Sequence, residues 1–424
     1  MARHLPLRPN SAGFVAVAGL AAFSTYFCMY AFRKPVAAAQ FDTFEPAFGI
    51  NFKVAVILCQ VIGYALSKWI GVRVIAERST RRRGASILAL MGISFMGLLG
   101  FAILPAPFNL TMVLLSSLPL GMIWGFVFGW LEGRRSSEVL VAILSASFIL
   151  ASGVVKSVGA TLLAIGVSET WMPVTTACLF ALPLIISVMV LAHIPLPNED
   201  DLTERGIRSA MGRPERAAFL QRAGLPLALL AVTYVGFSVM RDVRDSFAAE
   251  VWAENGRGGE VALFTLSEAP IALFILCALA LFSAIRDNAR AFRVAMTAIL
   301  AGCLLLIAST LAFAFRGLGV LPWMIISGSG LFLAYVAIGT VVMERLIALG
   351  SGAANAGFAV YLIDAMGYTA SLGLLLSRDV FFPDLNWSGL IIQLALLSGS
   401  LGAVSALALS RRTGRLTQFA MSCR

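Results

Sequence analysis

Charged side chains are scarce in this chain of 424 residues: Asp, Glu, Lys and Arg make up 13%, whereas 59% of the residues are hydrophobic. A soluble domain of this length cannot bury so much apolar surface, which excludes an ordinary soluble globular protein. Histidine is limited to His4 and His193, and neither lies near a nucleophile. A Walker-type glycine loop and an HExxH run are also lacking, so we predict that the chain is not an enzyme.

Paired cysteines are lacking as well. The six cysteines show neither metal-ligand nor disulfide spacing, and all but Cys423 lie inside apolar segments. We interpret them as small packing residues, and we predict neither a metal nor another cofactor. The net charge of +10 permits a nucleic-acid partner, but the cations stand in short segments between apolar runs. This placement favours membrane topology, with no nucleic acid bound.

Apolar runs of helix length dominate the sequence. Their approximate ranges are 12–40, 48–72, 84–104, 108–131, 139–166, 170–194, 223–250, 260–285, 291–315, 319–346, 353–376 and 386–409. Each is long enough to cross a bilayer core of ~30 Å. We predict an all-α membrane protein of twelve transmembrane helices with the major facilitator fold. Its parts are an N-terminal six-helix bundle (1–194), a cytoplasmic linker (195–222) and a C-terminal six-helix bundle (223–424).

The placement of Lys and Arg predicts the orientation. Even-numbered connections carry pairs and clusters such as Arg134 with Arg135, and the C-terminus adds Arg411 and Arg412. Odd-numbered connections hold mainly acidic residues. By the positive-inside rule, both termini and the linker are cytoplasmic. The first apolar run is too long for a cleavable signal peptide, so we expect a multi-pass protein of a bacterial inner membrane.

One short pattern occurs twice, about half a chain apart. A Thr-Tyr pair is followed after six residues by an arginine, as Tyr26 and Arg33 in the first copy and Tyr234 and Arg241 in the second. Both arginines lie in apolar segments, where a guanidinium is costly enough to indicate a function. Matching helices of two halves, each with one arginine, predict a transporter with a central anion site.

Tyr30 extends the first copy. Tyr26, Tyr30 and Arg33 are spaced i, i+4 and i+7, which predicts one stripe on a helix. Two phenols and a guanidinium on one face are donors suited to phosphate or carboxylate oxygens. Alternatively, the arginines pair with carboxylates across the bundle. Lys34, next in sequence, can snorkel from a different face.

Further ionisable residues lie inside the apolar runs. Lys156 at mid-span and Lys68 near a span end add cations that favour anions, although Lys68 can instead snorkel to the interface. Asp245, Glu268 and Asp364 are candidates for coupling or gating. They either pair with the arginines in the empty site or carry protons, and the sequence leaves both roles open.

A fourth acidic residue, Asp242, follows Arg241 directly. Asp242 and Arg244 fall on opposite sides of a helix, where they either neutralise each other or lie close to a loop.

The first two spans resemble the organophosphate:phosphate antiporters of the major facilitator superfamily. Tyr26, Tyr30, Arg33 and Lys34 are similar to the family's Tyr-x3-Tyr-x2-Arg-Lys, whose arginine binds phosphate. The run from Gly63 to Lys68 is similar to the family's Gly-aromatic-x-x-Ser-Lys, whose lysine faces the pore.

The second half carries further parts of the resemblance. Arg241 matches the family's second phosphate-binding arginine, Asp245 lies close to its following acid, and Glu268 is similar to its eighth-span glutamate. Two features depart from it: Lys156 stands where the family has a histidine, and Asp242 and Arg244 are additional charges beside Arg241. The lysine favours a more anionic substrate.

The resemblance implies a secondary transporter that exchanges an organophosphate for phosphate by alternating access around two arginines. A proton-coupled transporter of another anion, such as a carboxylate, is the alternative that Glu268 and Asp364 would support. A non-transporting membrane sensor is a third possibility, which the short linker and termini disfavour. The expected partners are a small anionic substrate and the lipid bilayer, and the expected state is a monomer.

Overall fold

A computed structural model describes residues 10–77, 83–131, 134–195, 201, 213–283, 285, 287–342, 356–381 and 385–422. Its earlier helices are α1 (Ala12–Tyr30), η1 (Pro35–Ala38), α2 (Phe52–Glu77), α3 (Arg83–Ile103), α4 (Asn109–Ser117), η3 (Leu120–Met122), α5 (Ile123–Leu131), α6 (Ser137–Ala164) and α7 (Met172–His193). The later ones are α9 (Arg213–Ser246), α10 (Ala248–Glu254), α11 (Leu263–Ser283), α12 (Asn288–Ala314), α13 (Val320–Ala337), the π-helical η4 (Ile338–Val342), α15 (Ala356–Phe381) and α16 (Trp387–Ser422).

Ten stretches in the described part of the chain are long and apolar enough to cross a membrane. They correspond to ten of the twelve predicted spans, and α9 and α15 lie where the other two were predicted. The prediction of an all-α membrane protein is confirmed. Many large apolar side chains are exposed on these helices, such as Leu20 (67%), Leu281 (73%) and Val404 (65%), as expected of surfaces that face lipid.

The chain divides into two compact units, and each is discontinuous in sequence. Unit 1 comprises Met1–Gly206, Asp245–Ala272 and Leu372–Pro383. Unit 2 comprises Ile207–Arg244, Leu273–Ser371 and Asp384–Arg424. The bundle boundaries at 194 and 223 remain a prediction, and most of the predicted linker lies outside the described residues.

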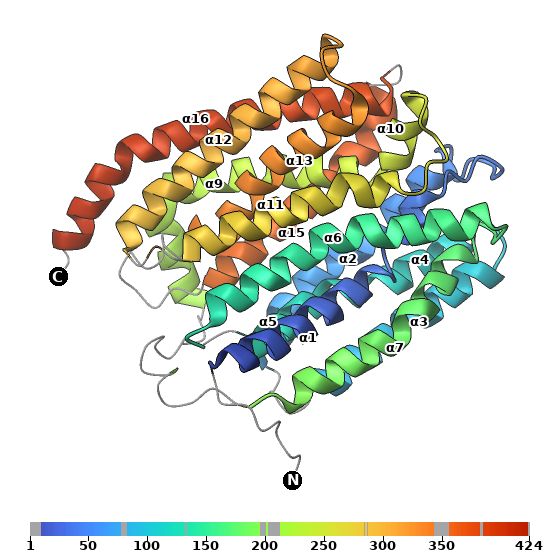
Figure 1. Cartoon of the computed structure of the whole chain (residues 1–424), viewed down its shortest axis with the longest axis horizontal. Coiled ribbons are helices and arrows are strands. Elements are labelled where there is room, and N and C mark those ends of the chain that lie inside the picture. Colours follow the sequence, from blue (N-terminus) through green and yellow to red (C-terminus); the bar gives the residue numbers. More distant parts are fainter. Residues whose placement is uncertain are drawn as a thin grey trace. The chain divides into compact units, whose positions relative to one another are not determined.

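Close helix contacts build each unit. In unit 1, α1 packs against α6 and α7, while α3 packs against α4 and α7 (Figure 1). In unit 2, α12 packs against α13 and α16. Gly302 and Gly330 let α12 and α13 approach, because a Cβ on either glycine would lie within 2.6 Å of the other's carbonyl oxygen. Small residues at helix contacts are typical of packing in lipid.

Proline and glycine interrupt three of the predicted spans. The first span, predicted as 12–40, is not one helix: α1 ends at Tyr30, and Pro35 starts η1. Proline lacks the backbone N–H of a helix interior and clashes with the preceding turn. Pro119 separates α4 from η3 in the same way. Gly224 kinks α9 with a φ of 32°, next to the predicted start of the seventh span.

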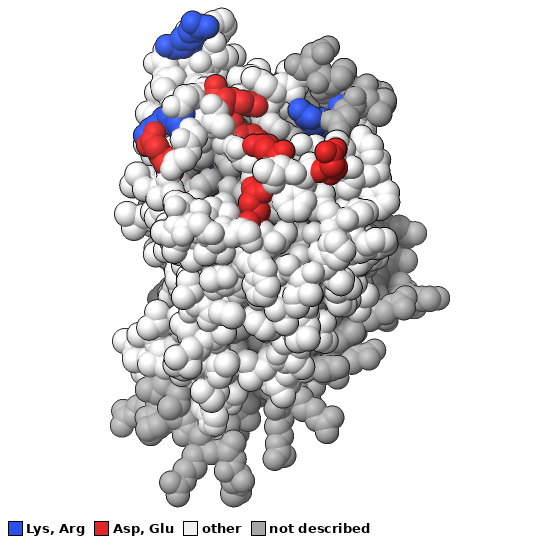
Figure 2. Space-filling view, turned by 90° about the vertical axis from the view of Figure 1, so that its right-hand side faces the viewer, with Lys and Arg blue, Asp and Glu red and all other residues white. Residues whose placement is uncertain are grey.

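Charged and uncharged side chains are separated on one face of the described surface. On the face drawn in Figure 2, the charged side chains of the described residues gather toward one end. A broad band of uncharged atoms covers the adjoining described surface. Such a band is expected where helices contact hydrocarbon.

Candidate functional site

Arg33 lies in the turn between α1 and η1. Tyr26 and Tyr30 pack edge to face on α1 with ring centroids 5.5 Å apart, as their spacing predicts. Arg33 is past the end of α1, so the predicted stripe of three residues on one helix is wrong for its third member. Its backbone N–H still donates to the carbonyl of Tyr30 at 3.0 Å, and the residue is only 4% exposed. The turn therefore keeps Arg33 buried, with its backbone hydrogen-bonded to the end of α1.

The ring of Tyr64 on α2 makes cation–π contacts with Arg33 and Lys68. Arg33 Cζ lies 3.8 Å from the centroid of the Tyr64 ring, and Lys68 Nζ lies 5.5 Å from the same centroid. Lys68 Nζ is also 5.9 Å from the Trp124 ring, and the residue is buried. Cation–π contacts of this kind stabilise cations away from water. Burial argues against the alternative in which Lys68 snorkels to the interface.

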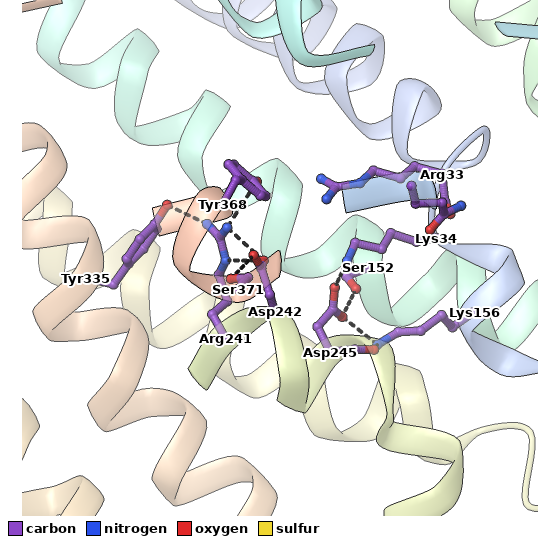
Figure 3. A network of polar contacts seen from close by, with 11 residues as sticks. Arg33, Lys34, Ser152, Lys156, Arg241, Asp242, Asp245, Tyr335, Tyr368 and Ser371 are labelled. Atoms are coloured by element: carbon purple, nitrogen blue, oxygen red, sulfur yellow. Dashed lines mark hydrogen bonds and ion pairs between the residues drawn. The ribbon is translucent and has the colours of Figure 1, made fainter. Parts of the chain in front are cut away.

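Three charged residues of unit 1, Lys34, Lys156 and Asp245, form a lysine–aspartate cluster together with the neutral Ser152 (Figure 3). Lys34 Nζ contacts Asp245 Oδ2, and Lys156 Nζ lies 2.6 Å from Oδ1. Ser152 donates to Oδ1 as well, and Lys156 reaches the Asp245 backbone carbonyl at 3.1 Å. Two ammonium groups share one carboxylate, so these groups carry a net charge of +1.

Two members of this cluster were not predicted from the sequence. The sequence allows Lys34 to snorkel from a different face, but the residue is buried and forms an ion pair. The missed signal is its place directly before Pro35, where α1 has ended and the helical-face argument no longer applies. Ser152 stands four residues before Lys156 on α6, so both side chains lie on one helix face.

Glu268 is buried where α6 meets α11 in unit 1. Gly153 of α6 permits this contact, because a Cβ there would lie 2.8 Å from Glu268 Cβ and 2.5 Å from the Phe264 carbonyl oxygen. Thr265 donates to Ser157 Oγ at 2.8 Å, which fixes the same pair of helices. Lys156 Nζ lies 5.6 Å from the Phe264 ring, so Glu268 and Lys156 share this helix contact.

Arg241 belongs to an arginine–tyrosine cluster within unit 2, formed with Asp242, Tyr335, Tyr368 and Ser371 (Figure 3). Arg241 Nη2 donates to Asp242 Oδ1 at 2.9 Å and to Tyr368 Oη at 3.0 Å. Nε donates to Asp242 Oδ1 at 3.3 Å, and Nη1 donates to Tyr335 Oη. Ser371 donates to Asp242 Oδ2 at 2.9 Å. Asp242 thus pairs with its sequence neighbour, while Arg244 donates to the Met324 carbonyl at 2.8 Å.

Tyr234 and Asp364 continue this network. The Tyr234 hydroxyl donates to Tyr335 Oη at 2.7 Å and lies 3.3 Å from Asp364 Oδ1. Tyr335 Oη lies 3.4 Å from the same carboxylate oxygen. The rings of Tyr234 and Tyr335 stack with their centroids 4.5 Å apart. Tyr335 was not predicted, since its span shows no other polar residue in register with it. The π-helical η4 begins three residues later, and such turns are frequent at functional sites.

Comparison with known proteins defines the fold further. The model of a family of unknown function, DUF5690, matches residues 35–411. No curated protein sequence matches the chain. Among solved structures, a D-xylose–proton symporter is similar with a TM-score of 0.64 and 12% identity, covering 93% of this chain and 95% of that one.

Two further solved structures resemble the chain over nearly its whole length. The nucleoside transporter NupG has a TM-score of 0.59 and 15% identity, covering 93% of this chain and 98% of that one. A mutant peptide transporter in complex with sulfate has a TM-score of 0.60 and 14% identity, covering 98% and 97%. These likenesses show that the predicted major facilitator fold is correct.

Proposed function

We propose that this chain, which belongs to the DUF5690 family of unknown function, is a secondary transporter of a small organic anion. The fold supports a transporter, since the similar solved structures are a sugar symporter, a nucleoside transporter and a peptide transporter. Such folds move a substrate by alternating access, in which a central site opens to each side of the membrane in turn.

The observation that carries the anion part is the group of buried cations in unit 1. Arg33, Lys34, Lys68 and Lys156 are each at most 6% exposed, and they lie on or beside α1, α2 and α6. Buried charges inside a membrane protein are costly and usually mark substrate or ion pathways. Asp245 contacts both Lys34 and Lys156, so the two ammonium groups share this carboxylate. An anion that enters this region gains favourable electrostatic energy.

We further propose that the anion is an organophosphate and that phosphate is its exchange partner. Arg33 and Arg241 bind the substrate in this proposal, together with the hydroxyls of Tyr26, Tyr30 and Tyr234. A guanidinium forms two parallel hydrogen bonds to a phosphoryl group, which gives both affinity and geometric selectivity. Stacking on Tyr64 fixes the guanidinium plane of Arg33, which reduces the ordering cost of binding.

Proton-coupled transport of a carboxylate is the second candidate function. The observation in its favour is Asp364 on α15, which is buried and lies within hydrogen-bond distance of the Tyr234 and Tyr335 hydroxyls. Buried carboxylates in membrane spans often carry protons. Glu268 and Asp245 are the other acidic residues that would couple or gate transport in either candidate.

Uptake of radiolabelled phosphate into proteoliposomes preloaded with phosphate tests the proposal. We expect exchange in the wild type and its loss in Arg33→Ala and in Arg241→Ala. Arg257→Ala is the matched control, because Arg257 pairs with Glu260 in an exposed loop. Lack of exchange by a folded wild type would contradict phosphate exchange. Uptake that instead follows an imposed proton gradient would favour the second candidate.

A further inference from the structure

We propose that an ion pair between Lys53 and Glu250, the Lys53–Glu250 latch, blocks access to the buried cations of unit 1 and separates whenever that end of the transporter opens. This inference rests on the proposed transport by alternating access and adds two gating residues to it. Lys53 Nζ contacts Glu250 Oε1. Both residues belong to unit 1, although Glu250 follows the predicted linker in the sequence. The latch therefore joins segments from opposite sides of that linker.

Lys53 is a buried cation at an unfavourable position. It stands in the first turn of α2, where Asn51 Oδ1 accepts hydrogen bonds from the backbone N–H groups of Lys53 (2.9 Å) and Val54 (3.4 Å). The N-terminal end of a helix disfavours positive charge, and the residue is only 2% exposed. Glu250 compensates the charge, and the Ala37 carbonyl of η1 accepts from Nζ at 3.1 Å. Lys53 therefore connects α2 with both α10 and η1.

Glu250 is bound less completely than its partner. Its side chain is 17% exposed, whereas that of Lys53 is 2% exposed, so the latch lies at the boundary of the buried interior. Within the described part of the chain, no donor contacts the buried Oε2 of Glu250. A buried ion pair is most stable when further hydrogen bonds satisfy its remaining oxygen. An incompletely bonded carboxylate is expected of a contact that opens and closes.

Apolar side chains of α10 surround the latch. α10 packs against η1, and Val251 and Trp252 on it are at most 2% exposed. The Phe247 ring, just before α10, has its centroid 5.9 Å from Lys53 Nζ. η1 precedes the first predicted connection and α10 precedes the seventh, so both elements lie at the predicted extracytoplasmic end. The contact therefore excludes water at this end while α10 lies on η1.

The latch lies at the outer end of a helix face that leads to the candidate site. Lys53, Gln60, Tyr64 and Lys68 are spaced i, i+7, i+11 and i+15 on α2, so they share one face, and all four are buried. Gln60 donates to the Arg33 carbonyl at 2.8 Å, and the Tyr64 ring stacks on the Arg33 guanidinium. Movement of α10 away from η1 would uncover this face from Lys53 inward.

Labelling of a buried cysteine tests the latch without any substrate. Ile57 lies one turn after Lys53 on α2 and is 2% exposed. In Ile57→Cys protein in proteoliposomes, the rate of modification by N-ethylmaleimide is followed by mass spectrometry of the peptide that contains this cysteine. We expect Glu250→Gln to raise the rate by about tenfold, because loss of a contact made only in the closed state increases the open population. Glu260→Gln, which removes a carboxylate from an exposed loop, should leave the rate unchanged.

The outcomes separate this inference from the transport proposal. An unchanged rate in folded Glu250→Gln protein would overturn the latch and leave anion transport standing. Faster labelling, in a protein that does not exchange phosphate, would support the latch and contradict phosphate exchange. If Glu250→Gln does not fold, Glu250→Asp provides the test, because its shorter side chain weakens the contact with Lys53. Its rate should rise by a smaller factor, and an unchanged rate would again overturn the latch.

Exchange of the two charges distinguishes an ion pair from general packing. Lys53→Glu combined with Glu250→Lys restores a pair of opposite charges and places a carboxylate in the first turn of α2, where it is favoured. The labelling rate of this double variant should return toward that of Ile57→Cys alone. A rate that stays as high as in Glu250→Gln would mean that the ion pair is not the latch.

Discussion

The two copies of the Thr-Tyr…Arg pattern have the same residues at the same spacing but different surroundings. In unit 1 the helix ends at Tyr30, and Arg33 stacks on Tyr64 in a turn. In unit 2 helix α9 continues past Arg241, which pairs with Asp242 and with phenols. A repeated sequence pattern therefore keeps the residue type while the neighbours determine how the charge is compensated.

Among the substitutions that test this difference between the two units, loss of a lysine from unit 1 should have the largest effect on phosphate binding. Lys156→Met takes away one of the two lysines that contact Asp245 and so removes one buried positive charge from the cluster. We expect phosphate affinity to fall by about 100-fold, or about 2.7 kcal/mol, because the anion loses a buried cation from its surroundings. Isothermal titration calorimetry measures the change. An affinity within twofold of the wild type would show that the anion does not depend on this cluster.

Replacement of Arg33, which stacks on Tyr64, should have an intermediate effect on phosphate transport. Arg33→Lys keeps the charge but loses the planar guanidinium that stacks on Tyr64 and forms paired hydrogen bonds. We expect phosphate uptake into proteoliposomes to fall by about tenfold, or about 1.4 kcal/mol. Lys68→Arg serves as the comparison at the same ring. Full activity of Arg33→Lys would mean that charge alone is needed at this position.

A smaller effect is expected from the phenols of unit 2. Tyr335→Phe removes the hydroxyl that accepts from Arg241 and Tyr234, while its ring remains to stack on Tyr234. We expect the free energy of unfolding to decrease by about 1–2 kcal/mol. Thermal unfolding of the detergent-solubilised protein checks this, with Phe332→Leu as a control for altered ring packing nearby. An unchanged melting temperature in Tyr335→Phe would contradict the network.

The smallest effect concerns a pair outside both clusters. In the exposed loop after α10, the hydrogen bond from Arg257 holds the pKa of Glu260 below its ordinary value. The stability from this pair is therefore present above the unfolded pKa and is lost as pH falls through the lower folded pKa. Glu260→Gln should lower the melting temperature slightly at pH ~7 and not at pH ~3. A difference that grows on acidification would contradict this sign.

Much of the fold was predictable from the sequence, because the apolar runs directly reflect the thickness of the bilayer. The ends of the helices were less predictable. Arg33 was assigned to a helical stripe, since the pattern of Tyr26 and Tyr30 continues into it, but Pro35 ends the helix first. The pairing of Arg241 with Asp242 was also missed. Helical periodicity places consecutive side chains apart, whereas contacts from α13 and α15 hold these two side chains where they meet.

The sequence indicated which charged residues are buried in the candidate site, but it did not indicate which residues they contact. Buried charges in apolar runs indicated Lys156, Asp245 and Asp364 without their neighbours. Contacts between residues far apart in sequence, such as Lys34 with Asp245, depend on tertiary packing that no local pattern records.

Trans-stimulated efflux tests the central claim most directly. Proteoliposomes containing the wild-type chain are loaded with radiolabelled phosphate and diluted into buffer with or without external phosphate. The account predicts rapid efflux only when phosphate or an organophosphate is present outside, because a site lined by buried cations reorients slowly without an anion. Efflux that is equally fast without an external anion, or that is absent under both conditions, would contradict the anion exchanger.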